Sequence, residues 1–151
     1  MNMTIKQIRR WAAAVAAICL LTLFLPLYGM TAFAATARIA FSDPTASVGS
    51  EINVKMKITS SDNLSTADIM LAYDPGSLEF IEGTNAEGGN GAVRVHGDGG
   101  GANTTTLAYD LKFKASAAGT SKITVTSQEI YDASSQIVTV DKQGESQVTV
   151  S

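Results

Sequence analysis

Residues 71–80, with the sequence Leu-Ala-Tyr-Asp-Pro-Gly-Ser-Leu-Glu-Phe, predict two β-strands joined by a sharp corner. Leu71 and Tyr73 alternate with smaller residues, the period-2 pattern of a half-buried strand. Pro75 has no amide hydrogen for a ladder hydrogen bond, so the strand is expected to end before it. Asp74 is expected to cap the turn with its carboxylate, and Gly76 to supply conformational freedom. The next strand then returns to the core.

Short segments with the same alternation lie on both sides of this corner. The clearest is 51–59, in which every second residue from Ile52 to Ile58 is apolar, and 104–114 repeats the pattern. Turn residues separate these segments, and 60–63 is expected to be a polar loop. No helical stripe follows residue 35. Eight or nine short strands of this kind predict an all-β fold, a two-sheet antiparallel β-sandwich.

The N-terminal segment, residues 1–34, has the organisation of a signal peptide. Basic residues at 6–10 precede a largely apolar run at 11–27, and the small-x-small pattern at 31–34 fits cleavage after Ala34. A transmembrane anchor is the alternative, but the run is shorter than the ~20 residues that a spanning helix needs. A lipoprotein signal at Cys19 is disfavoured by the bulky Ile18 before it. We therefore expect a secreted protein.

The charge of the expected mature chain, residues 35–151, limits its partners. All 14 acidic residues lie there, whereas three of the 11 basic residues precede it, which leaves a formal charge of −6. Such a chain disfavours nucleic acid or an anionic membrane surface as partner. It contains no Cys, so that the fold must rest on its own core. Its length fits one domain.

The order of these features resembles the cohesin domain, the receptor module of cellulosome scaffold proteins. Residues 71–78 resemble the family's L-x-Y-D-P-x-x-L segment, and 65–70 its third strand. Residues 107–115 resemble its seventh strand, and 119–125 the loop and eighth strand. The resemblance covers nearly all of 37–151. It implies a sandwich of about nine strands with jelly-roll topology.

The resemblance also implies a function. In cohesins, the sheet of strands 8, 3, 6 and 5 binds a dockerin, a small helical module of a secreted glycoside hydrolase or of another scaffold protein. The protein would then be a non-catalytic, extracellular receptor for polysaccharide degradation, either free or attached to the cell surface through parts outside this chain. Calcium would belong to the dockerin, and no cofactor or metal is expected on this chain.

The side chains that would face a dockerin follow from the expected strand phase. They are Asp68, Met70 and Ala72 on strand 3, Arg94 and His96 on strand 6, and Lys122, Thr124 and Thr126 on strand 8. Met70 and Asp68 are the expected anchors, because a flat face with a central Met and a carboxylate at its edge suits a helix. Residues 83–91 are rich in Gly and are expected to form a loop in place of a full fifth strand.

Other kinds of site have weaker support. His96 is the only His, and a metal site would need more ligands around it. The glycine-rich 97–101 is not followed by a helix whose N-terminus would hold a phosphate. A glycosidase would need two carboxylates facing one cleft, and no spacing in the sequence places a pair together. Calcium binding by the Asp-bearing loops stays open, without EF-hand spacing.

A carbohydrate-binding sandwich is the main alternative, because it shares the architecture. Such modules present exposed aromatic rings to sugars. Of the six aromatic residues after Ala34, all but Tyr131 have the phase of the core. This pattern disfavours a sugar platform. A structural spacer without a ligand is a third possibility.

Overall fold

The computed structural model describes residues 33–151, of which Ala34–Ser151 form one compact unit. Apart from its last two residues, the predicted signal peptide lies outside the described residues, and its cleavage stays a prediction. Within 33–151 no helix is long and apolar enough to cross a membrane. The described residues form ten strands: β1 (Thr36–Phe41), β2 (Thr45–Ala46), β3 (Glu51–Ala72), β4 (Leu78–Gly83), β5 (Ala86–Gly89), β6 (Ala92–Gly97), β7 (Thr104–Ala115), β8 (Gly119–Asp132), β9 (Thr139–Gln143) and β10 (Ser146–Val150).

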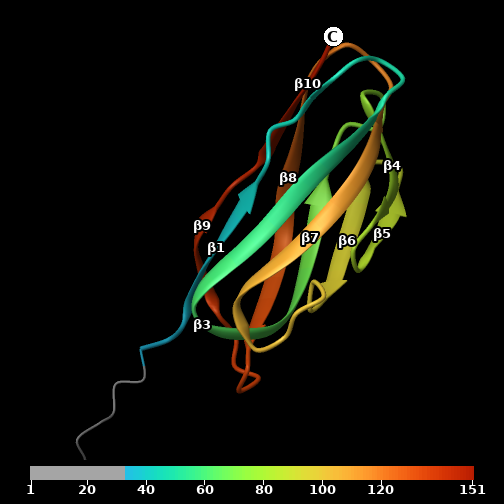
Figure 1. Ribbon diagram of the computed structural model, residues 1–151. Helices are drawn as coiled ribbons and strands as arrows, with labels where there is room; N and C mark the ends of the chain where they lie inside the picture. Colours follow the sequence, from blue (N-terminus) through green and yellow to red (C-terminus); the bar gives the residue numbers. More distant parts are fainter. Residues whose placement is uncertain (1–32) are drawn as a thin grey trace, which may run out of the picture. The chain divides into compact units, whose positions relative to one another are not determined.

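The strands form two packed layers that share β3 (Figure 1). The C-terminal half of β3 pairs with β6 and β8, and these extend to β5 on one side and to β10 and β2 on the other. The N-terminal half pairs with β1 and β7, which extend to β9 and β4. We call these the first and the second sheet. The predicted sandwich is confirmed. All pairs are antiparallel except β1 with β9 and β2 with β10.

β3 is one strand of 22 residues, although a loop was expected at 60–63. The polar residues there form the bend at which the strand passes from the second sheet to the first. The pairing with β7 shifts register between Thr59 and Leu64. Hydroxyl groups accept main-chain hydrogen bonds at the bend, Ser60 from Asp62 at 3.3 Å and Ser61 from Thr36 at 3.2 Å. The loop prediction was wrong because these side chains satisfy the bent backbone.

The core lies between the inward faces of the two sheets. Phe113 of β7 packs edge-on against Tyr73 and Phe80, with ring centroids 5.2 and 5.5 Å away. This geometry stabilises aromatic pairs beyond the area that they bury. The largest fully buried aliphatic side chains come from both sheets: Ile39, Met56, Ile58, Leu64, Ile69, Leu71, Leu78, Leu107, Leu111 and Ile123.

The corner after Tyr73 forms as predicted, with one difference. Asp74 accepts hydrogen bonds from the Gly76 amide at 3.0 Å and from the Ser77 hydroxyl at 2.5 Å. Both bonds favour the ionised carboxylate, so that the Ser77 hydroxyl and then the Gly76 amide lower the pKa of Asp74. Gly76 is not among the glycines with positive φ. Its part in the turn is therefore the donated amide, and not the conformational freedom that was expected.

A fifth strand exists, contrary to the expectation from 83–91. β5 pairs with β6 along all four of its residues, Glu87 lying opposite Arg94. Gly88 makes this pairing possible. Its φ is +155°, and a Cβ atom there would lie 2.7 Å from the Cα atom of Val93. The same glycine content that disfavours a strand in the sequence therefore allows β5 to lie close to β6.

Candidate protein-docking face

The outer face of the first sheet is built by β8, the C-terminal half of β3, β6 and β5, and we call it the docking face. Its side chains lie in rows across the strands. The first row is Thr124, Ala72 and Ala92; the second is Ser127, Met70, Arg94 and Glu87; the third is Glu129, Asp68 and His96. Six of the eight residues predicted for this face lie in these rows. Lys122 is exposed on β8 beside them, and Thr126 is displaced from the alternation.

Asp68 holds a charged cluster in the third row. Arg94 donates two hydrogen bonds to its carboxylate, from Nε at 3.0 Å and from Nη2 at 2.7 Å. The His96 Nδ1 atom lies 3.4 Å from the same carboxylate. The pKa of Asp68 is lowered, mainly by the hydrogen bonds from Arg94 and to a smaller extent by the positive charge of Arg94. The same interactions raise the pKa of Arg94. The bidentate geometry fixes both side chains on the face.

Met70 lies beside a shallow hollow of about 380 Å³. The hollow is also lined by Glu87, Gly88, Gly89, Asn90, Ala92 and Arg94. Small residues leave room there for a side chain from a partner. A polarizable Met next to an open hollow is typical of surfaces that receive apolar side chains.

A β-bulge in β8 changes which of its residues face outward. Leu71 pairs with Val125, but Met70 pairs with Ser127, so that Thr126 is the extra residue. The Thr126 hydroxyl donates to the Met70 carbonyl oxygen at 3.2 Å. Beyond the bulge, alternation continues one residue out of phase. Thr126 is exposed, but it lies between the rows.

The bulge brings Ser127, Glu129 and Tyr131 to the docking face. Sequence reasoning placed Tyr131 outside the phase of the core, but it assigned none of the three to this face. The signal was present in the apolar pattern. Inward residues occupy odd positions at Ile123 and Val125, and an even position at Ile130. Such a change of parity within one strand indicates a bulge.

Lys122 is exposed on β8 as predicted, but it is engaged by another strand. Its ammonium group lies 2.6 Å from the Glu145 carboxylate, just before β10. This pair lies beside the rows of the docking face. On this face the carboxylates of Glu87 and Glu129 form no ion pair within 4.0 Å in the described part of the chain, whereas Arg94 occupies that of Asp68.

Tyr131 is the aromatic side chain of β8 on this face, and it is half-buried. Its hydroxyl donates to Glu129 at 3.3 Å, and the negative charge of Glu129 raises the pKa of the phenol. The remaining aromatic rings after Ala34 are buried or pack against the core. A single half-buried ring does not make a stacking platform for sugars.

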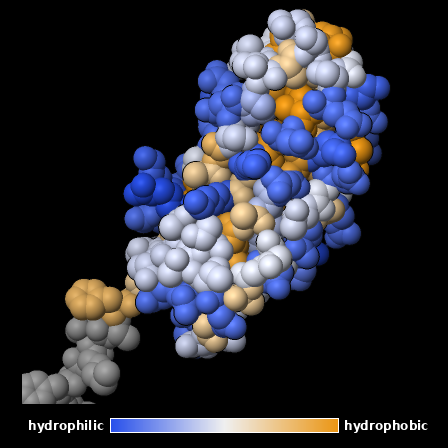
Figure 2. Space-filling view, in the orientation of Figure 1, coloured by the Kyte–Doolittle hydropathy of each residue, from blue (hydrophilic) through white to orange (hydrophobic). Residues whose placement is uncertain are grey.

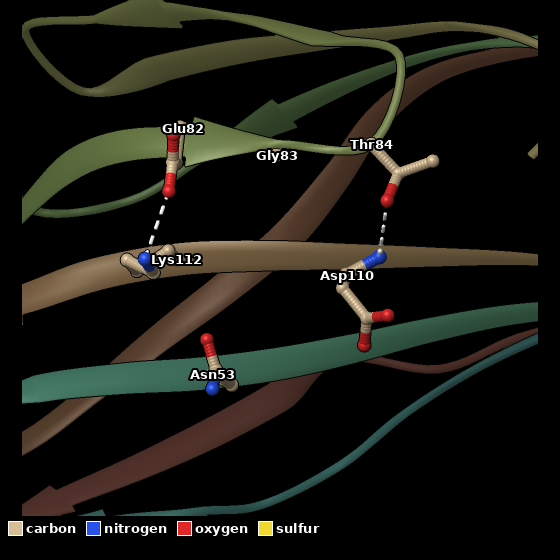
Figure 3. Close-up of a pocket in the computed structure, with 6 residues that line it drawn as sticks. All are labelled: Asn53, Glu82, Gly83, Thr84, Asp110 and Lys112. Atoms are coloured by element: carbon tan, nitrogen blue, oxygen red, sulfur yellow. Dashed lines mark hydrogen bonds and ion pairs between the residues drawn. The ribbon is translucent and has the colours of Figure 1, made fainter.

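A polar pocket of about 350 Å³ lies on the other side of the sandwich (Figure 3). It brings together two carboxylates, of Glu82 and Asp110, that the sequence did not place near each other. Glu82 bonds to Lys112 at 2.8 Å, and this hydrogen bond lowers its pKa. The general acid of a glycosidase needs a raised pKa instead. The lowered pKa of Glu82 therefore does not suit the part of that proton donor.

Comparisons with known proteins give one consistent result. No family model matches the sequence, and no curated protein matches it. Solved structures do match. A non-cellulosomal cohesin from Archaeoglobus fulgidus has 21% identity and a TM-score of 0.64, covering 77% of this chain and 91% of its own.

Two further matches are cohesins solved in complex with dockerins. The sixth cohesin of scaffoldin B from Acetivibrio cellulolyticus has 19% identity and a TM-score of 0.65. A type I cohesin from Clostridium thermocellum has 17% identity and the same score. Each alignment covers 77% of this chain and 99% of the other. Residues 34–151 therefore have the jelly-roll sandwich fold of cohesin modules.

Proposed function

We propose that this protein is a secreted, non-catalytic receptor that binds the dockerin module of an extracellular enzyme or scaffold protein. The docking face would receive a dockerin helix, with Met70 and Asp68 as anchors. The effect would be to hold a polysaccharide-degrading enzyme in a complex or at a surface. The calcium of such a complex would be bound by the dockerin.

The proposal rests on one observation: a chain with the fold of cohesins has Met70 and the Asp68–Arg94 pair together on the outer face of its first sheet. Four strands present a flat surface with Met70 at its centre and a fixed Asp68–Arg94 pair beside it. A flat surface with one apolar anchor and a few oriented polar groups suits a helix. Similar cohesins are solved with dockerins bound, which supports the same class of partner here.

Capture of secreted proteins by the immobilised domain tests this proposal. The bait would be residues 34–151, the compact unit of the structure. We expect calcium-dependent capture of enzymes that share a small calcium-binding helical module, identified by mass spectrometry. Met70→Arg should abolish this capture. Asn53→Arg, which alters an exposed residue of the same strand on the opposite sheet, should not.

The outcome that contradicts the proposal is equally concrete. If no dockerin-bearing protein is captured, or if chelation of calcium leaves capture unchanged, the likeness to cohesins stops at the fold. Retardation of the domain by a neutral polysaccharide, lost on mutation of the docking face, would favour the carbohydrate-binding alternative instead.

A further inference from the structure

The basic residues of this acidic protein are concentrated on one surface, the outer face of the second sheet. Of the eight basic residues after position 34, six lie there, and the domain elsewhere has only Arg94 and Lys122. Figure 2 shows this face, which is largely hydrophilic over β1, β3 and β7. The six are Arg38, Lys55, Lys57, Lys112, Lys114 and Lys142.

Four of the six are neighbours across three strands, and we call them the basic strip: Arg38, Lys55, Lys57 and Lys142. Lys142 on β9 lies opposite Arg38 on β1, and Arg38 lies opposite Thr59 on β3, next to Lys57. Direct and diagonal neighbours in a sheet are ~5–8 Å apart at Cβ. The four side chains, all exposed, therefore form one continuous line of positive charge.

The basic strip is only partly compensated by neighbouring carboxylates. None of the ion pairs within 4.0 Å among residues 33–151 involves its four members. Asp110 lies opposite Lys55, and Asp141 lies next to Lys142, but neither carboxylate comes within that distance. Lys112 differs, because it has Glu82 at 2.8 Å and Glu51 at 3.8 Å.

Adjacent like charges in a sheet lower stability. Asp110 partly offsets this repulsion at Lys55, but Arg38, Lys57 and Lys142 have no carboxylate directly opposite them in the described strands. An anionic ligand would relieve the repulsion that remains. The strip also borders a hollow of about 310 Å³, which is lined by Arg38 and Ala37, by the hydroxyl residues Thr36, Thr59, Ser60 and Ser61, and by Asp141. Hydroxyl groups next to a guanidinium suit a ligand that carries both hydroxyls and carboxylates.

We propose that the basic strip binds a linear acidic polysaccharide, a chain of uronic acid units. The Arg38 guanidinium would hold one carboxylate through two hydrogen bonds, as its planar fork allows. Lys55, Lys57 and Lys142 would attract carboxylates further along the chain as point charges. Thr36 and Thr59 would bond sugar hydroxyls. No aromatic ring is needed, because charge replaces stacking as the source of affinity.

A single chain fits this surface better than a membrane or a nucleic acid duplex. The exposed large apolar side chains of the described residues are Phe33, Val48, Ile81 and Ile137, none of which belongs to the strip or pairs with it. The strip thus has nothing to insert into lipid. A formal charge of −6 on residues 35–151 also repels any broad anionic surface. A narrow chain meets only the strip.

The basic strip and the docking face lie on opposite sheets, and β3 contributes to both. Lys55 and Lys57 come from its N-terminal half, and Asp68 and Met70 from its C-terminal half. A polysaccharide and a protein partner can therefore be bound at the same time. This inference does not depend on the dockerin proposal.

Affinity electrophoresis in native gels containing polygalacturonate tests the inference. We expect the protein to be retarded at low salt and released as added salt screens the charges. The double substitution Lys55→Gln and Lys57→Gln should lower the affinity about tenfold, because the loss of each exposed charge costs a few-fold in affinity. The matched control is Lys114→Gln with Lys122→Gln, which removes the same charge outside the strip and should bind as the wild type does.

Three results would overturn the inference. The first is no retardation of the wild type at low salt. The second is an equal loss in both double variants, which would indicate attraction by overall charge. The third is binding to duplex DNA or to phosphatidylglycerol vesicles in place of polygalacturonate. All four substituted lysines are exposed, and circular dichroism of each variant checks that the fold is retained.

Discussion

The hydroxyl of Tyr109 donates a hydrogen bond of 2.6 Å to the main-chain carbonyl oxygen of Gly97. Tyr109 lies on β7 of the second sheet, and Gly97 is the last residue of β6 in the first sheet. The bond thus ties the two layers together where the docking face ends. Burial raises the pKa of the Tyr109 phenol, so that the donor stays protonated at neutral pH.

Tyr109→Phe should destabilise the protein by about 0.5–1.5 kcal/mol, because it leaves a carbonyl oxygen at the inner side of β6 without its donor. Urea unfolding followed by circular dichroism measures this. Tyr131→Phe is the matched control, since its hydroxyl bonds only to the exposed Glu129, and it should unfold as the wild type does. If both substitutions change the free energy of unfolding equally, the hydrogen bond from Tyr109 to Gly97 does not stabilise the fold.

Met70→Arg and Asp68→Ala should each weaken binding of the protein partner while leaving the fold intact. A charged side chain at Met70 would block the hollow beside Gly88 and Gly89, and the loss expected for a central anchor is roughly 30-fold or more. Titration calorimetry with the captured dockerin gives the affinities. Asn53→Arg serves as control. Unchanged affinity in both Met70→Arg and Asp68→Ala would remove the docking face as the site.

Much of this architecture follows from alternation in the sequence. The segments 51–59 and 104–114 have one strongly apolar face each, and a one-residue slip would expose it. Their phase was therefore predictable, as was the inward position of Val93 and Val95, which leaves Arg94 outward. The corner at Asp74 was equally clear, because Pro ends a ladder and Asp caps a turn.

The rest depended on contacts between distant residues. The change of parity between Val125 and Ile130 indicates a bulge in β8, but its position at Thr126 is decided by pairing with β3, 56 residues away along the chain. The hydrogen bond that supports the bend at Ser61 comes from Thr36, 25 residues away, and the closeness of β5 to β6 at Gly88 is a tertiary feature in the same sense. The basic strip was hidden for a further reason, since its members come from β1, β3 and β9, and only the register aligns them.

Gly88→Ala should destabilise the domain more than Gly89→Ala does. The two glycines have similar backbone angles, with φ of +155° and +149°, so that any strain of the backbone is shared. A Cβ atom at Gly88 would press against the main chain of β6, whereas one at Gly89 meets no atom within 4 Å. We expect a difference of about 1–3 kcal/mol, measured by thermal unfolding. A smaller loss in Gly88→Ala would mean that β5 is not held tightly on β6.

The Asp68–Arg94 pair should make a small, pH-dependent contribution to stability. Because Arg94 lowers the pKa of Asp68 in the folded state, this contribution is present above the ordinary carboxyl pKa of about 3.9 and is lost as the pH falls through the lowered value. Wild type should therefore melt at a higher temperature than Asp68→Asn at pH 6, and the difference should vanish in acid. A gap that persists at pH 2 would contradict the ion pair as its source.

Deletion of Thr126 should be tolerated, whereas deletion of Thr124 should not. Without Thr126, Val125 is followed directly by Ser127, and both halves of β8 keep their inward and outward phases against β3. Only the hydroxyl bond to Met70 is lost. Without Thr124, the residues between it and the N-terminal end of β8 reverse their faces, so that Ile123 turns to solvent and Lys122 to the core. Thermal unfolding should show a modest shift for the first deletion and loss of the cooperative transition for the second. Comparable damage from both would mean that the bulge is itself required by the fold.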